Sequence, residues 1–303
     1  MILRDLFSQE WTMLALRHLK YFVAISEETS FVSAAKKLNT VQSSLSQQMK
    51  DLEDFVGVDL FERGSRIISL TKAGEVFLIE AKKALIEAEK AQNLASKLKT
   101  KINEVKIGVL IGAEVKIPRV ILDAIKDNDA AVKVEIISEM GPSLILKLEK
   151  GEIDLAFTRS DINNEEIKSH ECLEEDLMIV LPKDHELNKY SHIPIKELDG
   201  LDFIMPSVDY APELRSKILS IVQDHNVELN VVAETENAFV TMSYVNMGMG
   251  ITILPDYIYS IATNEVMIKK FLRIEPKVKL FLNYRNTENP ALDVLLSMIR
   301  KGS

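Results

Sequence analysis

Residues 40–56 carry the side chains best suited to chemistry on another molecule. On a helical wheel of about 100° per residue, their apolar residues gather on one side and small hydroxyl, amide and ammonium groups on the other. Such groups exchange hydrogen bonds with base edges, and a helix fits the major groove of DNA. A helix whose polar side only faces water is the alternative. The apolar side holds Val41, Leu45, Met49, Leu52 and Val56, and the polar side holds Ser43, Ser46, Gln47 and Lys50, with Gln42 at its flank.

Two further helices precede this stretch and would hold it in place. Apolar residues recur at helical spacing over 16–28, which predicts a first helix. Ser30 is a suitable cap for a second helix, and Thr40 for the third. The short step from the second helix to the third is typical of a helix-turn-helix. The buried side of the second helix would be Phe31, Ala34, Ala35 and Leu38.

A short β-hairpin is predicted directly after the third helix. Residues 58–61 and 67–70 are strand-like, and Arg63 and Arg66 lie near the turn between them. Two arginines at a turn are usually only solvated. After a helix-turn-helix, however, they are suited to phosphates or the minor groove, so we interpret the hairpin as a wing that contacts DNA.

A long helix over 71–99 follows, and Thr71 can cap it. Apolar and small residues recur along it at intervals of three and four, which is the spacing of a coiled-coil seam. We interpret the seam as a dimerisation surface, because two copies of the domain would then present two recognition helices. Packing against the chain's own helices is the alternative. The seam comprises Leu78, Ala81, Leu85, Ala88, Gln92 and Ala95.

Five blocks of this region, in order and at matching intervals, resemble the N-terminal signature of LysR-type transcriptional regulators. The resemblance implies a winged helix-turn-helix at 13–70, with a recognition helix that bears Gln42, Ser43, Ser46 and Gln47. It also implies Arg63 and Arg66 on the wing and a homo-oligomer, often a dimer of dimers. Many members have arginine where this chain has Gln47, and members usually begin near Met13, so 1–12 are an extension. The blocks are Leu16–Phe22, Ser30–Ala35, Gln42–Gln48, Leu60–Arg63 and Leu70–Gly74.

From about residue 105 the pattern changes to short β-branched runs alternating with helical stretches. This predicts an α/β fold with parallel sheets, long enough for two lobes. The half resembles the effector-binding domain of the same regulators, which is similar to type II periplasmic binding proteins. The predicted lobes are 103–176 with 276–303, and 177–275. The predicted strands are 105–111, 132–137, 155–158, 177–181, 203–205, 229–232, 251–254 and 278–284, and a C-terminal helix is expected over 291–300.

Four strand-to-helix junctions are the candidate effector site. In open α/β sheets, ligands bind beyond the carboxyl ends of strands, where free amides attract anions. The motifs Ala113–Val115, Val240–Met242 and Gly248–Pro255 resemble those of regulators of aromatic-acid catabolism, such as phenylpropionate- and cinnamate-responsive members. This resemblance implies a small carboxylate in an interlobe cleft. Glu114 and Glu236 would repel such an anion, which leaves a neutral or cationic effector open. The candidate residues are Ile111, Gly112, Ala113, Pro142, Ser143, Pro206, Ser207, Val208, Thr235 and Asn237.

The overall charge of −9 over 303 residues argues at first against a DNA-binding protein, which needs basic residues at its contacts. The charge is unevenly distributed, however. Residues 1–100 carry a net charge of +1, and 101–303 carry −10. An acidic total is therefore compatible with DNA binding by the first hundred residues.

The sequence contains few features that are typical of an enzyme, a metalloprotein or a membrane protein. The single cysteine, Cys172, lies among glutamates that would raise its thiol pKa, and no metal-ligand spacing or nucleotide motif occurs. We therefore predict no enzyme, no cofactor and no metal. No apolar stretch suits a membrane span and the N-terminus does not resemble a secretory signal, so we expect a cytoplasmic protein. A solute-binding protein or a sensor without a DNA role is the alternative. The predicted partners are promoter DNA, a small effector and further copies of the chain, with RNA polymerase as another candidate.

Overall fold

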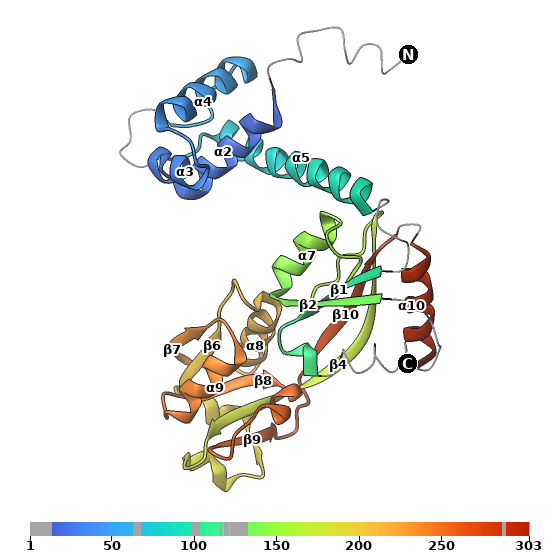
Figure 1. The fold of residues 1–303 in the computed structure, drawn as a ribbon. Helices are drawn as coiled ribbons and strands as arrows, with labels where there is room; N and C mark the ends of the chain where they lie inside the picture. Colours follow the sequence, from blue (N-terminus) through green and yellow to red (C-terminus); the bar gives the residue numbers. More distant parts are fainter. Residues whose placement is uncertain are drawn as a thin grey trace. The chain divides into compact units, whose positions relative to one another are not determined.

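The computed structural model describes residues 14–62, 68–97, 104–115, 117, 121, 133–286 and 289–302. The chain forms two compact units, Met1–Asn93 and Leu94–Ser303, which we describe separately (Figure 1). The predicted extension, 1–12, lies outside the described residues.

The first unit contains the predicted helices. Ser30 caps α3, because its Oγ accepts a hydrogen bond from Ser33 N at 3.3 Å, and Thr71 caps α5 by accepting from Gly74 N at 3.0 Å. Both caps were predicted and are confirmed. The helices are α2 (Leu16–Glu28), α3 (Phe31–Lys37), α4 (Gln42–Val56) and α5 (Lys72–Lys97).

The start of α4 differs from the prediction. Thr40 is not the cap: its backbone N–H donates to Ala35 O, and Val41 occupies the cap position with an extended backbone and no side-chain cap bond. Val41 is 63% exposed although the wheel placed it on the buried side. The wheel failed there because Val41 precedes the helix, so its side chain does not follow the helical periodicity.

Aromatic rings form the centre of the first unit. Phe22 of α2 is fully buried, with its ring centroid 5.2 Å from that of Phe61 and 5.1 Å from that of Phe77 on α5. Phe31 of α3 lies 6.0 Å from Phe61. Edge-to-face and tilted pairs of this kind are favourable beyond their burial. This cluster attaches the segment after α4 to three of the helices.

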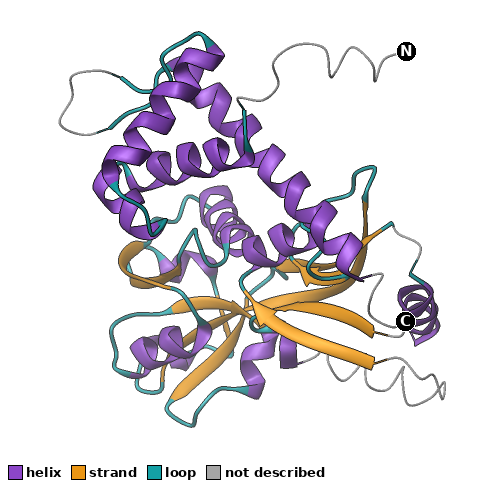
Figure 2. Ribbon diagram, turned by 45° about the horizontal axis from the view of Figure 1, so that its top comes forward, coloured by secondary structure: helices purple, strands orange, loops and turns teal. Residues whose placement is uncertain are grey.

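The second unit has two apolar cores, which define two lobes. The first core lies between β1, β3 and β10 and the helices α7 and α10, and the second gathers around β6, β8, α8 and α9. In the first lobe, α7 and α10 lie on opposite sides of the sheet (Figures 1 and 2). The predicted lobe boundaries stay predictions. The helices are α7 (Gly141–Glu149), α8 (Pro212–Asp224), α9 (Ala238–Asn246) and α10 (Pro290–Gly302), with short 3-10 helices η1 (Ala113–Val115), η2 (Glu186–Lys189), η3 (Ile195–Leu198) and η4 (Asp256–Ser260).

The sheets are mixed, whereas parallel sheets were predicted. β1 pairs in parallel with β2 and β3, but β10 runs antiparallel to β3 and β4, and β4 runs antiparallel to β8 and β9. The sheet order is β2-β1-β3-β10-β4-β9-β5, with β8 also on β4, and β6 pairs in parallel with β7. The strands are β1 (Glu104–Leu110), β2 (Lys133–Glu139), β3 (Leu155–Thr158), β4 (Ile167–Pro182), β5 (His192–Ile193), β6 (Asp202–Pro206), β7 (Asn230–Thr235), β8 (Thr252–Pro255), β9 (Val266–Phe271) and β10 (Lys277–Arg285).

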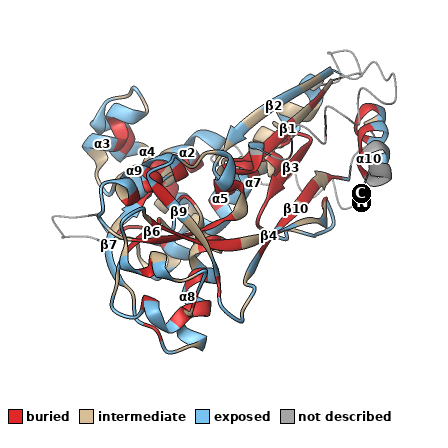
Figure 3. Ribbon diagram, turned by 90° about the horizontal axis from the view of Figure 1, so that it is seen from below, coloured by how far each residue is buried: buried red, intermediate tan, exposed pale blue. Residues whose placement is uncertain are grey.

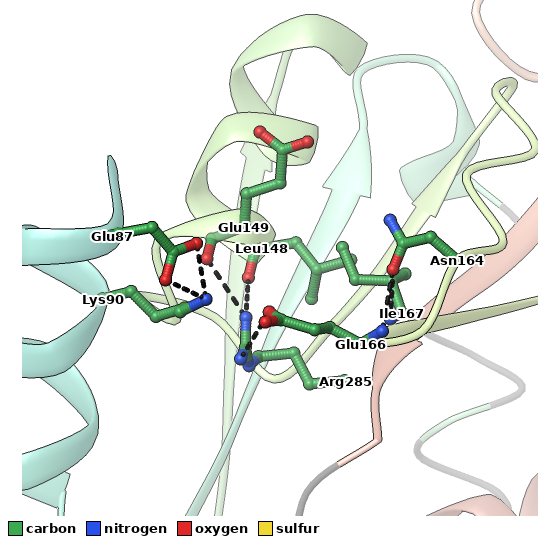
Figure 4. Close-up of polar contacts among 8 residues, drawn as sticks. All are labelled: Glu87, Lys90, Leu148, Glu149, Asn164, Glu166, Ile167 and Arg285. Atoms are coloured by element: carbon green, nitrogen blue, oxygen red, sulfur yellow. Dashed lines mark hydrogen bonds and ion pairs between the residues drawn. The ribbon is translucent and has the colours of Figure 1, made fainter. Parts of the chain in front are cut away.

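The strand β4 serves both lobes. Its first part pairs with β10 and its last part with β8 and β9, and Figure 3 shows much of β4, β3 and β10 buried. At the start of β4, Asn164 Oδ1 accepts from Ile167 N at 2.8 Å. Nearby, Arg285 Nη1 donates to the carbonyls of Leu148 and Glu149, at 3.0 and 3.1 Å, which satisfies the end of α7 (Figure 4).

Candidate functional site

The helix α4 presents the predicted recognition side chains to the surface. Leu45, Met49 and Leu52 are 0–2% exposed and bury the other side of the helix in the core of the first unit. Burial of this apolar row leaves the polar row facing outward. The exposed residues are Gln42, Ser43, Ser46, Gln47 and Lys50.

Gln47 is oriented by a neighbour that the sequence interpretation missed. Its Nε2 donates to Asp51 Oδ1 at 2.8 Å, one helical turn further on. This bond uses one of the two amide hydrogens of Gln47, so the second hydrogen and the carbonyl oxygen stay available to another partner. The i, i+4 spacing of an amide and a carboxylate was the available signal in the sequence.

The base of the predicted wing is attached to the last turn of α4. Glu53 Oε1 accepts from the backbone N–H groups of Leu60 and Phe61, at 2.7 and 3.1 Å. Phe61 and Leu70 then form an antiparallel bridge, which fits a hairpin. Arg63 and Arg66 lie outside the described residues.

The predicted seam of α5 is partly used by the first unit itself. Ala81 is 3% exposed, and Leu78 and Leu85 are half-buried against the core of the unit. Further along, Ala88 is half-buried, while Gln92 and Ala95 are exposed. The side chains of Leu78, Ala81 and Leu85 therefore have an intrachain role, because they complete the core beneath α2 and α4.

Another apolar row lies on the opposite side of α5. Val76 is 65% exposed and Ile79 is 57% exposed, and Lys83 and Ile86 continue the same row at intervals of four and three. This row has the spacing of a coiled-coil seam. The sequence interpretation missed this row, which is interrupted by Lys83.

In the first lobe the structure brings two of the four predicted junctions together. Ile111 N donates to Glu139 O at 3.1 Å, so the end of β1 lies beside the end of β2. Ser143 Oγ donates to Glu139 Oε2 at 2.5 Å, and Lys147 Nζ also bonds this carboxylate. The bond from Lys147 has the largest effect and, with the bond from Ser143, lowers the pKa of Glu139. Burial raises this pKa, but by less. Pro142 is exposed, whereas Gly112 and Ala113 are buried.

In the second lobe the other two junctions also meet. Pro206 pairs with Thr235 in the β6–β7 register, and Ser207 N donates to Thr235 O at 2.9 Å. The Thr235 hydroxyl is buried and lies 2.6 Å from that of Thr241, while Asn237 caps α9 through Val240 N. Val208 is 57% exposed. The hydroxyl of Thr235 and the amide oxygen of Asn237 thus already have intralobe partners.

Contacts between the lobes involve residues that the sequence interpretation missed. Gly112 of the first lobe lies so close to Tyr257 of the second that a Cβ at position 112 would be 2.7 Å from the tyrosine Cζ. Ser160, just after β3, hydrogen-bonds through Oγ to the Glu213 carboxylate at the start of α8. Only Gly112 among these was predicted, because the others stand in segments with no motif.

A buried ion pair lies beside this lobe boundary. Arg159 Nη2 is 2.7 Å from Glu175 Oε2, with side chains 4% and 1% exposed. Asn283 Nδ2 donates to Thr158 Oγ1 at 3.0 Å and to Ser160 O at 3.1 Å. These bonds fix the end of β3 against β10 and β4, where the chain passes between lobes.

Groups suited to other chemistry are not gathered in the described part of the chain. No three His, Cys, Asp or Glu side chains of those residues come together as metal ligands. None of the helices described combines the length and apolar character needed to cross a membrane. Burial, with the glutamates Glu175 and Glu171 as smaller causes, raises the pKa of the Cys172 thiol to about 12. Cys172 is therefore protonated at neutral pH and a poor nucleophile.

Two family models match the chain. Residues 16–75 match the bacterial regulatory helix-turn-helix protein of the lysR family, and residues 102–303 match the LysR substrate binding domain. The second match alone spans about two thirds of the chain. The solute-binding alternative accounts for neither the helix-turn-helix match nor the exposed polar row of α4.

Individual relatives give the same result. The chain is 33% identical over 287 residues to the Hca operon transcriptional activator HcaR of Escherichia coli, covering 94% of this chain and 97% of that protein. It is 29% identical over 281 residues to the transcriptional regulator BenM of Acinetobacter baylyi, with 90% of each covered. The crystal structure of full-length BenM superposes with a TM-score of 0.57 and 27% identity, covering 95% of this chain and 96% of that one.

The bonds to Glu139 predict a pH-dependent stability. Because its pKa in the folded state lies below the ordinary value of 4.5, the carboxylate contributes stability above that pH, which is lost as the pH falls through the folded pKa. We expect Glu139→Gln to lower the melting temperature at neutral pH, with the difference closing in acid. Glu165→Gln, at an exposed position, is the control. A difference that persisted unchanged in acid would contradict the assignment.

Proposed function

The chain belongs to the LysR family of bacterial transcriptional regulators, and from this membership we propose how its residues bind DNA, effector and a second copy. As a member it is a DNA-binding regulator with an effector-binding domain. In our proposal it acts in the cytoplasm, where promoter DNA is found, and regulates without catalysis. RNA polymerase is a candidate partner of the DNA-bound form.

In our proposal α4 is the recognition helix. The observation that carries it is the outward row of hydroxyl, amide and ammonium groups opposite the buried Leu45, Met49 and Leu52. Ser43, Ser46 and Gln47 would meet base edges in the major groove, while Lys50 and the wing arginines Arg63 and Arg66 would meet phosphates or the minor groove.

A negative charge in this row should weaken specific binding. We expect Ser46→Asp to weaken binding roughly ten-fold or more, since a base contact contributes about 1–3 kcal/mol and the carboxylate also repels phosphates. The probe is a duplex that the wild-type chain selects from a random-sequence library, followed by fluorescence anisotropy. Ser216→Asp, at an exposed position of α8, is the control. Wild-type affinity in Ser46→Asp would contradict the recognition role of α4.

We propose that two copies associate along α5 by the row Val76, Ile79, Lys83 and Ile86. The support is that Val76 and Ile79 are mostly exposed. By contrast, the seam predicted from the sequence packs in part against its own unit, through Leu78, Ala81 and Leu85. Pairing of two such rows would bury apolar surface that the unit leaves in water.

Charge placed in this row should dissociate the oligomer. We expect Val76→Glu combined with Ile79→Glu to raise the dissociation constant at least roughly ten-fold, because two unpaired carboxylates would be buried. Sedimentation over a concentration series measures this. Leu219→Glu, which changes a 45% exposed residue of α8, is the control. Unchanged association would instead favour the segment from Ala88 to Ala95.

For the effector we propose a small carboxylate, and an aromatic one in particular, bound where the lobes meet. The support is the placement of the four junctions in two pairs, one in each lobe, together with the resemblance to regulators of aromatic-acid catabolism. The lobe contact at Gly112 and Tyr257 would then sense occupancy, since an effector alters the regulator only if it binds one lobe arrangement better.

A methyl group at position 112 should uncouple the lobes from the effector. We expect Gly112→Ala to lose at least half of the rise in melting temperature that a carboxylate such as cinnamate or phenylpropionate gives the wild type. Gly200→Ala is a matched control, since both glycines have positive φ (100° and 72°) but nothing lies within 4 Å of a Cβ at 200. The carboxylate proposal would be contradicted if no member of such a panel stabilised the wild type.

A further inference from the structure

A histidine near the start of α2 connects this helix to the recognition helix. The backbone N–H of Ala15 donates to His18 Nδ1 at 3.1 Å, and His18 Nε2 lies 3.1 Å from Gln48 Oε1 on α4. His18 is only 9% exposed. One imidazole therefore caps the first turn of α2 and contacts the flank of α4.

The hydrogen bonds determine the tautomer of this ring. A backbone N–H can only donate, so Nδ1 must carry a lone pair. In the neutral ring the proton then resides on Nε2, which donates to the carbonyl oxygen of Gln48. The direction of donation is thus fixed: Ala15 N donates to His18, and His18 donates to Gln48.

Gln48 stands at a position where such a bond controls the rotation of α4 about its axis. It is half-buried, between the outward Gln47 and the buried Met49. Apolar contacts such as those of Leu45 and Met49 are non-directional and tolerate small rotations, whereas a hydrogen bond is directional. Recognition side chains must be held to about 0.5 Å and 10–20° of their working geometry.

We propose that His18 is a positioning residue for DNA recognition, which sets the rotation of α4 through Gln48. The inference rests on the proposed role of α4 in reading bases. It assigns a role in sequence discrimination to a side chain that is nearly buried and lies on another helix. The loss of the bond should therefore reduce discrimination between sequences more than it reduces general attraction to DNA.

The test compares a duplex that the wild-type chain selects from a random-sequence library with a scrambled duplex of the same composition. We expect Gln48→Leu to lower affinity for the selected duplex about three- to ten-fold, the range of one hydrogen bond. Affinity for the scrambled duplex should stay within about two-fold, because non-specific binding depends on phosphate contacts that the variant leaves in place. Gln48→Glu keeps an acceptor oxygen and should restore the ratio of the two affinities. Gln223→Leu, at an exposed position of α8, controls for the gain of a leucine.

A second variant separates positioning from a direct contact of Gln48 with DNA. His18→Phe keeps a ring at the same place and removes both hydrogen bonds. It should lower the ratio of affinities as Gln48→Leu does, and the double variant should lose no more than either single one, because both remove the same bond. Melting temperatures of all variants account for any loss of folded protein.

Three results would overturn the inference. The first is an unchanged ratio in Gln48→Leu, and the second is an unchanged ratio in His18→Phe when Gln48→Leu lowers it. The third is a double variant in which the two losses add. A wild-type chain that selected no sequence would overturn the proposed DNA recognition, and the inference with it, before any variant was compared. Nitrogen NMR of the histidines in the full chain adds a direct readout, since a proton on Nδ1 of His18 would contradict this direction of donation.

Discussion

Burial of one side of α4 is the constraint on which the DNA-binding unit depends. Leu45, Met49 and Leu52 enter a core whose centre is the ring of Phe22. The fold cannot bury them without turning the opposite row outward, so stability and presentation of the polar groups have the same cause. The apolar row determines which side of α4 faces the core. The directional hydrogen bonds of Gln48 to α2 and of Glu53 to the segment after α4 then restrict how far the helix can rotate.

In the effector unit, one strand connects the two lobes, and a buried ion pair lies beside the boundary between them. A single strand, β4, contributes to the sheets of both lobes, and the buried pair of Arg159 and Glu175 fixes the turn after β3 beside it. Removing either partner of such a pair leaves a buried charge and costs about 3–5 kcal/mol. Contacts between the lobes in the described part of the chain include the backbone of Gly112 against Tyr257 and the hydroxyl of Ser160 with the carboxylate of Glu213. In our proposal the contact of Gly112 with Tyr257 senses whether the effector site is occupied.

The sequence predicted the helices of the first unit well because their apolar spacing and caps are local signals. It failed at Val41, whose exposure depends on where the helix begins. The predicted seam of α5 stays a prediction, and spacing alone could not say that its residues Leu78, Ala81 and Leu85 also pack against their own unit. In the second unit β4 is much longer than the five predicted residues, since its first part has polar residues such as Glu171 and Glu174 on an exposed face. The strands β5 and β9 were missed because they form by pairing with strands that are distant in the sequence. Tyr257 and Glu213 meet their partners only through tertiary structure, so no motif marks them.

The central claim, that the outward row of α4 reads bases in the major groove, is tested most directly by methylation interference. Dimethyl sulfate adds a methyl group to guanine N7, which lies in the major groove, and a duplex so modified can be sorted by whether the full chain still binds it. The account predicts that methylation of guanines within two separate half-sites prevents binding. Binding that was indifferent to N7 methylation throughout a guanine-containing selected duplex would contradict it.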